Sequence, residues 1–401
     1  MVLMLGGLGA HMSLRVLASL SRVSGKLSYA EIVRELLGAR AESFLEWVLI
    51  VYSVGVLVSY FVFLGDFLPH VATVMGYPDL ITRDASILVL AVLIFPVALL
   101  RRLSAFRYLS VGSVVCLSYV MSVCVVEAPG KHAQLQEDIP MFGYELGWLN
   151  GKLLSAPRAV EGVMKCVCVG VFCFCCHLNV FASYVDMARP TSQRLGKVFN
   201  RSSVALFVLY CSVGVAGFLS FGRDTPEDML MGHHQSYAAT LGNVAMSVTL
   251  VVVIIMNTPP AREEVVAKVQ RLGPQKETLL GQNAHARKPA GPVLHVVSTA
   301  GLIGVSMLGA LKFANVVTII GVVGGGCGVM FMFFFPLFMM NSSGFQKSPE
   351  VDTQCVGPPL RGRYLSAVNA LFLFYIVVGW ASTSMSFYRM ATDPPEAAAP
   401  R

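Results

Sequence analysis

The chain has 401 residues, of which 55% are hydrophobic and only 13% are charged, and its mean hydropathy is +0.66. Soluble domains carry about 25% charged residues, so this composition excludes an ordinary soluble protein and indicates a chain built for lipid. The net charge of +7 comes from basic residues spread over five short loops rather than gathered on one face, which argues against nucleic-acid binding.

Ten apolar segments approach the roughly 20 residues that a helix needs to cross about 30 Å of hydrocarbon. Loop-forming glycine and proline residues separate them. We therefore predict an all-α polytopic membrane protein with about ten transmembrane helices, which form a single transmembrane domain over residues 1–401. The segments are approximately 1–20, 42–64, 85–100, 105–126, 159–184, 202–221, 237–257, 293–311, 315–340 and 364–388.

The first segment resembles a secretory signal peptide in length and apolar character. It has no basic n-region and no A-x-A cleavage site, and its removal would leave the basic residues from Arg22 to Arg40 on the wrong side of the membrane. We therefore interpret residues 1–20 as a transmembrane helix that enters from the extracytoplasmic side.

Lysine and arginine alternate between the predicted loops. Of the 30 basic residues, 20 lie in the odd-numbered loops and 8 in the even-numbered loops and the C-terminal tail. The positive-inside rule then places the odd-numbered loops in the cytoplasm. This predicts an extracytoplasmic loop at 127–157, a basic cytoplasmic loop at 261–292 and a short extracytoplasmic tail at 390–401. We expect an integral protein of the plasma membrane or of an endolysosomal, acidic organelle, with the lipid bilayer as its solvent.

The stretch FCFCCHLNVFASYVDMARPTSQR, from Phe172 to Arg194, places thiols, an imidazole and an amide in an apolar segment. Cys173, Cys176 and His177 have a spacing that suits zinc, but a structural zinc site needs four ligands and no fourth is evident. A catalytic thiol would need a matching histidine and acid, so we predict no metal, no cofactor and no enzyme activity. Two interpretations stay open: polar links between helices, or a cluster that faces a cavity or pathway, since polar groups are costly at membrane depth.

The same stretch carries a family resemblance. Phe174-Cys-Cys-His177-Leu-Asn179, followed by Tyr184-Val-Asp186-Met and Arg189-Pro190-Thr191, resembles the F-x-x-H-x-N…Y-x-E-M…P-T pattern of the amino acid/auxin permease family, with Asp186 in place of the usual Glu. In that family the pattern forms the sixth helix and the loop after it. The likeness spans nearly the whole chain, and the abundance of cysteine is similar to trypanosomatid members. It continues in Ser28-Tyr29-Ala30-Glu31, in Gly217-Phe218-Leu219 with Phe221-Gly222, and in Asn257-Thr-Pro259.

The resemblance implies a LeuT-like, inverted-repeat transporter fold, in which helices one and six are interrupted at the midplane and hold the substrate. Family members have eleven helices, and the ten segments here align with the second to the eleventh, so we expect the first helix to be missing. The implied function is secondary active transport of amino acids by alternating access, coupled to H⁺ or Na⁺. The alternative is a non-transporting amino-acid sensor or an inactive, truncated relative.

If the sixth helix unwinds around residues 170–179, its freed backbone groups can bind a zwitterion. Each side chain near it also has an ordinary structural interpretation: tyrosines pack, hydroxyls bond to their own helix, and Glu161 pairs with Lys165. Glu161 or His177 is also a candidate for carrying a coupling proton. The substrate-binding candidates are Phe174, Cys175, Cys176, His177, Asn179 and Tyr52, and the coupling-ion candidates are Glu161, Ser247, Thr249 and Asn257.

The run Gly324-Gly-Gly-Cys-Gly328 lies in the next-to-last segment. No strand precedes it and its surroundings are apolar, which excludes a nucleotide-binding loop. We predict that it allows close helix packing or forms a hinge.

Overall fold

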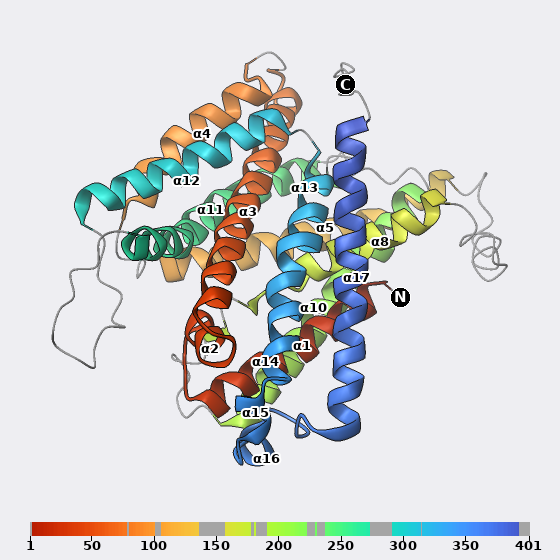
Figure 1. Cartoon of the computed structure of the whole chain (residues 1–401). Helices are drawn as coiled ribbons and strands as arrows, with labels where there is room; N and C mark the ends of the chain where they lie inside the picture. The colour runs from red at the N-terminus through yellow and green to blue at the C-terminus, as the bar shows by residue number, and fades with distance from the viewer. Residues whose placement is uncertain are drawn as a thin grey trace. The chain divides into compact units, whose positions relative to one another are not determined.

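The computed structural model describes residues 2–77, 80–100, 106–135, 157–177, 180–181, 191–222, 229–230, 237–272, 291–313 and 315–392. Every regular element in these ranges is a helix, and Figure 1 shows them in chain order from red to blue. The chain forms two compact units. Residues 1–48, 134–214 and 320–401 make the first unit, and residues 49–133 and 215–319 make the second.

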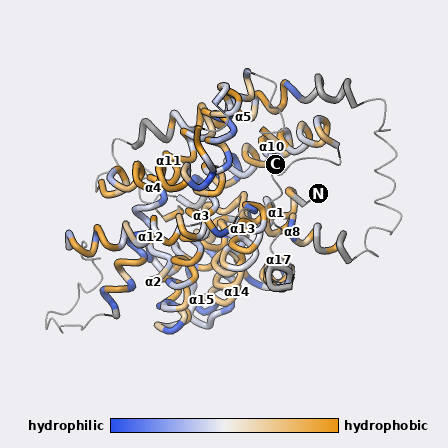
Figure 2. The backbone as a smooth tube through the Cα atoms, turned by 90° about the horizontal axis from the view of Figure 1, so that it is seen from above, coloured by the Kyte–Doolittle hydropathy of each residue, from blue (hydrophilic) through white to orange (hydrophobic). Residues whose placement is uncertain are grey.

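A helix covers each of the ten predicted segments, at least in part. Seven helices of the described ranges are long and apolar enough to cross a membrane, while the apolar parts of α5 and α8 are shorter and α4 has 16 residues. The predicted all-α polytopic fold is confirmed, and Figure 2 shows hydrophobic residues along most of the helices. The long helices are α1 (Val2–Ser24), α3 (Ala39–Val74), α4 (Arg83–Ala98), α5 (Phe106–Leu135), α8 (Pro157–Cys173), α10 (Ser192–Phe221), α11 (Tyr237–Leu272), α12 (Pro292–Lys312) and α17 (Gly362–Thr392).

The segment predicted at 315–340 is helical but not uniformly α-helical. It begins as α13 (Val316–Val322), continues as two π-helical stretches, η4 (Val323–Gly328) and η5 (Met330–Phe334), and ends as α14 (Phe335–Met340). A π-helix is wider than an α-helix and often marks a functional site. The predicted glycine run lies inside η4.

Three short helices occupy the connections of the first unit: α2 (Tyr29–Leu37), α15 (Ser343–Lys347) and α16 (Val351–Gln354). In α2 the buried residues are Tyr29, Ala30, Ile32 and Val33, a spacing that puts one apolar face on the protein. Gly38 follows with φ 92°, a left-handed conformation that glycine adopts without strain, and it ends the helix.

Two helices run beyond their predicted ends. α3 has 36 residues and therefore extends about 54 Å at 1.5 Å per residue, well beyond the hydrocarbon thickness. α11 continues through Pro259 and Pro260 to Leu272, so residues 261–272 of the predicted basic cytoplasmic loop are helical. α5 likewise enters the predicted loop at 127–157 as far as Leu135. Most of these two loops, and residues 393–401 of the tail, lie outside the described residues, and their sidedness stays a prediction.

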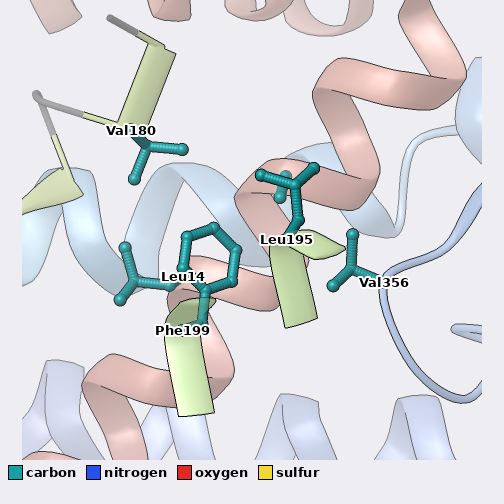
Figure 3. Packing of buried hydrophobic residues seen from close by; sticks show 6 residues of the cluster. Leu14, Val180, Leu195, Phe199 and Val356 are labelled. Atoms are coloured by element: carbon teal, nitrogen blue, oxygen red, sulfur yellow. The ribbon is translucent and has the colours of Figure 1, made fainter. Parts of the chain in front are cut away.

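In the first unit, an apolar cluster joins four segments that are distant in the sequence. Figure 3 shows side chains of α1, of the residues that follow α8, of α10 and of the loop before α17 around one centre. Ser19 of α1 adds a polar contact, because its hydroxyl accepts a hydrogen bond from the Val356 backbone N–H at 2.9 Å. The cluster therefore packs the residues that follow α8 in the sequence against α1. Its members are Leu14, Ala18, Val180, Leu195, Phe199 and Val356.

In the second unit, arginines hold both ends of α4. Arg83 at its start pairs with Asp66 of α3 at 3.0 Å and donates to the Ala310 carbonyl of α12 at 3.2 Å. At its end, the buried Arg262 of α11 donates to the Ala98 carbonyl at 2.9 Å. Because the last carbonyls of a helix lack partners within it, Arg262 both neutralises and fixes this terminus.

Candidate functional site

The helix α8 stops inside the segment where the sequence predicts an interruption. Its last residue is Cys173, the residues from Phe174 to Cys176 are not helical, and His177 is in a 3₁₀ conformation. Helix resumes at Val180 and Phe181, whereas residues 178–179, including the predicted site residue Asn179, lie outside the described residues. The break therefore ends the regular α-helical hydrogen bonding within the predicted span 159–184, although the backbone N–H groups of Phe174 and Cys175 still donate to the Gly170 and Phe172 carbonyls.

Glycines of α1 let it approach the break closely. A Cβ atom on Gly6 would lie 3.1 Å from the Gly170 carbonyl carbon, and one on Gly7 would lie 3.2 Å from the tip of the Phe174 ring. On another side Tyr210 of α10 meets the Phe174 ring edge-on, with 5.2 Å between ring centroids. The Tyr210 hydroxyl donates to the Cys173 carbonyl at 3.0 Å, so one carbonyl freed by the helix end has a partner.

The glycine run of η4 packs so closely on α8 and α17 that there is no room for side chains between the helices. A Cβ atom on Gly324 would lie 2.8 Å from the Cys168 carbonyl oxygen, and one on Gly325 would lie 2.7 Å from Thr383 Oγ1. On α17, a Cβ atom on Gly379 would lie 2.8 Å from the Gly325 carbonyl oxygen. Side chains at these positions would separate the three helices, which confirms the predicted close packing.

Carbonyls of the π-helical stretch η5 are held by hydroxyl groups from two other helices. Tyr29 of α2 donates to the Phe331 carbonyl and Ser13 of α1 donates to the Met332 carbonyl. The Tyr29 ring also lies 6.1 Å from that of Phe181, which follows the break. One aromatic residue thus links α2, η5 and the chain beyond α8. No sequence signal identifies the π-helical geometry, although its glycines are visible.

His177 is the most unusual side chain at the break. It is completely buried, and neither ring nitrogen has a hydrogen-bond partner in the described part of the chain. Its ring meets Phe331 of η5 edge-on, with 6.4 Å between the ring centroids. A buried polar group without a partner is destabilising by about 1–3 kcal/mol, so such groups are rare outside functional sites.

The other side chains predicted for the substrate site differ in burial. Phe174 is buried against α1 and α10, Cys175 is half-buried and Cys176 is exposed. These three residues and His177 lie together at the break because they are consecutive in the chain. Tyr52 is buried in α3, within the second unit.

The coupling-ion candidates on α11 all bond to their own helix. Ser247 donates to the Asn243 carbonyl at 2.9 Å, Thr249 to the Ala245 carbonyl at 2.9 Å and Asn257 to the Val253 carbonyl at 2.8 Å. This is the ordinary behaviour of such side chains in membrane helices, but it leaves oxygen lone pairs available, so the role in ion binding stays a prediction. The Glu161 side chain lies outside the described residues.

Asn243 of α11 is a polar residue that sequence reasoning missed. Its side chain is 1% exposed, and neither its amide nitrogen nor its amide oxygen has a hydrogen-bond partner among the described residues. The available signal is its position one helical turn before Ser247, in an apolar segment where an amide is costly.

The comparisons with known proteins agree with this architecture. A family described as transmembrane amino acid transporter protein matches residues 1–344. The chain is 25% identical over 299 residues to the "Putative amino acid transporter AAT1" of Toxoplasma gondii, a match that covers 73% of this chain and 40% of that protein. It is 24% identical over 235 residues to vacuolar amino acid transporter 6 of Saccharomyces cerevisiae, covering 57% of this chain and 50% of the relative.

A third relative is sodium-coupled neutral amino acid transporter 7 of Xenopus laevis, 26% identical over 275 residues, or 64% of this chain and 57% of the relative. The chain thus spans about half the length of these curated relatives. The family match includes α1, the break after α8 and both π-helical stretches. Because it extends over most of the sequence, the chain belongs to the transmembrane amino acid transporter protein family.

Proposed function

We propose that this protein is a secondary active transporter that moves amino acids across a membrane by alternating access, with the substrate held at residues 170–179. The observation that carries the proposal is the break at Phe174–Cys176, which places irregular backbone and the unpartnered His177 imidazole inside a predicted span. Irregular backbone at membrane depth is tolerated where it lines a cavity, and in transporters such breaks are where substrates bind.

The chemistry of the break suits a zwitterion. Backbone N–H groups attract a carboxylate and backbone C=O groups attract an ammonium group, so both ends of an amino acid have complementary partners. No charged residue occurs between Cys166 and Ser183, which favours amino acids with neutral side chains. We place Phe174, Cys175, Cys176, His177 and Asn179 beside the substrate, while the role of Tyr52, which lies in the second unit, stays a prediction from the sequence.

Membership in a transporter family favours a carrier over the sensor or the inactive relative. Relatives include a sodium-coupled transporter and a vacuolar transporter, which supports coupling to an ion gradient and either a plasma-membrane or an organellar location. Coupling is to H⁺ or Na⁺, and Glu161, Ser247, Thr249 and Asn257 stay candidates for binding the ion.

Exchange in proteoliposomes tests transport directly. Liposomes containing the purified chain are loaded with one neutral amino acid and given the same amino acid, radiolabelled, outside; a carrier accumulates label by exchange, whereas a sensor binds without exchange. The absence of exchange for every amino acid tested would contradict the proposal.

Thiol labelling tests the location of the site. In a variant that retains only Cys176, we expect a transported amino acid to slow alkylation by a membrane-permeant maleimide. A matched variant that retains only Cys116, a half-buried thiol of α5 in the second unit, should be alkylated at an unchanged rate. Equal effects at both thiols, or none at Cys176, would place the substrate elsewhere.

A further inference from the structure

His177 differs in its polar contacts from His11 and His295, two other histidines of the described residues. Nδ1 of His11 lies 3.2 Å from the Ser203 hydroxyl, and Nε2 of His295 lies 3.0 Å from the Leu99 carbonyl oxygen. His177 is more deeply buried than either and has no such contact at either nitrogen. A histidine kept for packing would be expected to have a partner, so the ring of His177 faces a position whose polar occupant is not part of the described protein.

Among the described residues, the groups buried around the ring carry no compensating charge. From the break itself the titratable neighbours are the thiols of Cys175 and Cys176. On α2 they are the phenol of Tyr29, which donates to the Phe331 carbonyl, and the acids Glu31 and Glu35, which are half-buried and exposed. The stretch η5 contributes Phe331 and only uncharged residues. None of these is a buried acid that would hold a protonated imidazole in a dry site.

The remaining charged or titratable groups on the helices packed nearby do not supply a counter-charge either. On α1 these are His11, Arg15 and Arg22, which would oppose a second positive charge. On α8 the nearest charged residue before the break is Lys165, more than three helical turns from His177 in sequence. No hydrogen bond joins His177 to any of them among the described residues.

These surroundings connect protonation to substrate binding. A protonated ring in the closed site requires an anion beside it, because a buried, unpaired charge is strongly unfavourable. The carboxylate of an amino acid bound at the broken backbone supplies that anion. In turn, the carboxylate loses its hydrating water when the site closes, and a charge-assisted hydrogen bond from the protonated ring stabilises it. Proton and amino acid therefore stabilise each other in the closed form, and each alone is disfavoured there.

We propose that His177 is the proton-binding residue through which a proton gradient drives amino-acid uptake, an inference that rests on the proposed function and names the coupling ion of the same site. A ring nitrogen lone pair takes a proton from extracytoplasmic water while the site is open to that side. After reorientation the carboxylate leaves, the proton returns to cytoplasmic water and the ring becomes neutral again. Each neutral amino acid thus carries one net positive charge inward.

The test compares driven accumulation with exchange in proteoliposomes. The wild-type chain should accumulate a neutral amino acid when the exterior is made acidic, without Na⁺, and an external pH dye should report proton loss from the medium on substrate addition. His177→Gln keeps a polar side chain that cannot carry a proton. We expect it to lose acid-driven accumulation and the proton signal, and to show a reduced exchange that no longer depends on pH, because the contact with the carboxylate is weakened. His295→Gln is the matched control, a buried histidine of the second unit, and should retain both activities.

Each other outcome is decisive. Acid-driven accumulation that persists in His177→Gln, or wild-type accumulation that follows only a Na⁺ gradient, would overturn the proton role while leaving the proposed transport function intact. Loss of exchange together with accumulation in His177→Gln would assign the ring to substrate binding or structure and also overturn it. Absence of exchange in the wild-type chain would instead reject the proposed function, and this inference with it.

Discussion

At the scale of single residues, glycines determine how closely the helices of the first unit can pack. Gly6, Gly324 and Gly379 occupy three different helices, and at each a Cβ atom would come within 3.1 Å of neighbouring atoms. Membrane helices gain little from the hydrophobic effect when they associate in lipid, so close van der Waals contact between backbones supplies much of their attraction. The glycines allow that contact beside the broken helix.

This packing predicts the effect of adding one methyl group. In Gly324→Ala the new Cβ would meet the Cys168 carbonyl oxygen at 2.8 Å, a backbone atom that cannot move alone, so the helices must shift. We expect a loss of about 1–3 kcal/mol of stability, the usual range for overpacking, seen as a lower Tm of the purified protein in detergent.

Gly301→Ala provides the matched control, because it is also in a helix but a Cβ there meets no atom within 4 Å. Its Tm should stay the same or rise slightly, since alanine favours helix over glycine by up to about 1 kcal/mol. Equal effects of the two substitutions would show that packing against Cys168 is unimportant.

At the scale of elements, a hydrogen bond connects the short helix α2 to the π-helical stretch η5. A π-helix alters the regular backbone hydrogen bonding of the span, and here the Phe331 and Met332 carbonyls receive hydroxyls from Tyr29 and Ser13. Because Tyr29 also contacts Phe181 beyond the break, α2 connects the irregular part of one helix with that of another. A movement of α2 would therefore affect both.

Removing one hydroxyl tests this connection. Tyr29→Phe keeps the ring contact with Phe181 but leaves the buried Phe331 carbonyl without this donor, so we expect a stability loss of about 1–3 kcal/mol and a lower Tm. Tyr364→Phe is the control, since the hydrogen bond of the Tyr364 hydroxyl among the described residues is to the weak acceptor sulfur of Met12, at 3.7 Å, and its loss should change Tm much less.

The pH dependence of the Tyr29 effect follows from its surroundings. Burial, followed by the influence of the Cys175 thiol, raises the pKa of the Tyr29 phenol well above its ordinary value. The folded protein therefore keeps the proton, and the contribution to stability is complete below the unfolded pKa of about 10 and declines only above it. The Tm difference between wild type and Tyr29→Phe should be the same at about pH 6 and about pH 9. A difference that shrinks within this range would contradict a buried, protonated donor.

At the scale of the whole molecule, the sequence predicts what hydrophobicity and charge control, and misses what depends on distant contacts. Apolar segment length places the helices, and the family pattern around His177 locates the break. The π-helical stretches, the passage of α11 through Pro259 and Pro260, and the unpaired nitrogens of His177 were not predicted. These features depend on packing between segments, such as the Tyr29–Phe331 hydrogen bond across 302 positions, and no local periodicity reports them.

The orientation of the molecule is the remaining prediction at this scale, and glycosylation can test it. The sugar is added only on the luminal side, to Asn-x-Ser/Thr sequences in accessible loops. Gln136→Asn with Asp138→Thr creates such a sequence in the predicted extracytoplasmic loop, and His285→Thr creates one around Asn283 in the predicted basic cytoplasmic loop. Expressed in eukaryotic cells, the first variant alone should show a mobility shift that endoglycosidase removes.

The native sequences Asn200-Arg-Ser and Asn341-Ser-Ser serve as internal controls, because the charge pattern places them at or near cytoplasmic loops, where they stay unmodified. A mobility shift of the His285→Thr variant alone would show that every loop lies on the side opposite to the predicted one. All loops change together because the helices fix the number of spans between the two test positions. The break after α8 would then open first to the opposite side, and the direction of transport inferred from the basic loops would change with it.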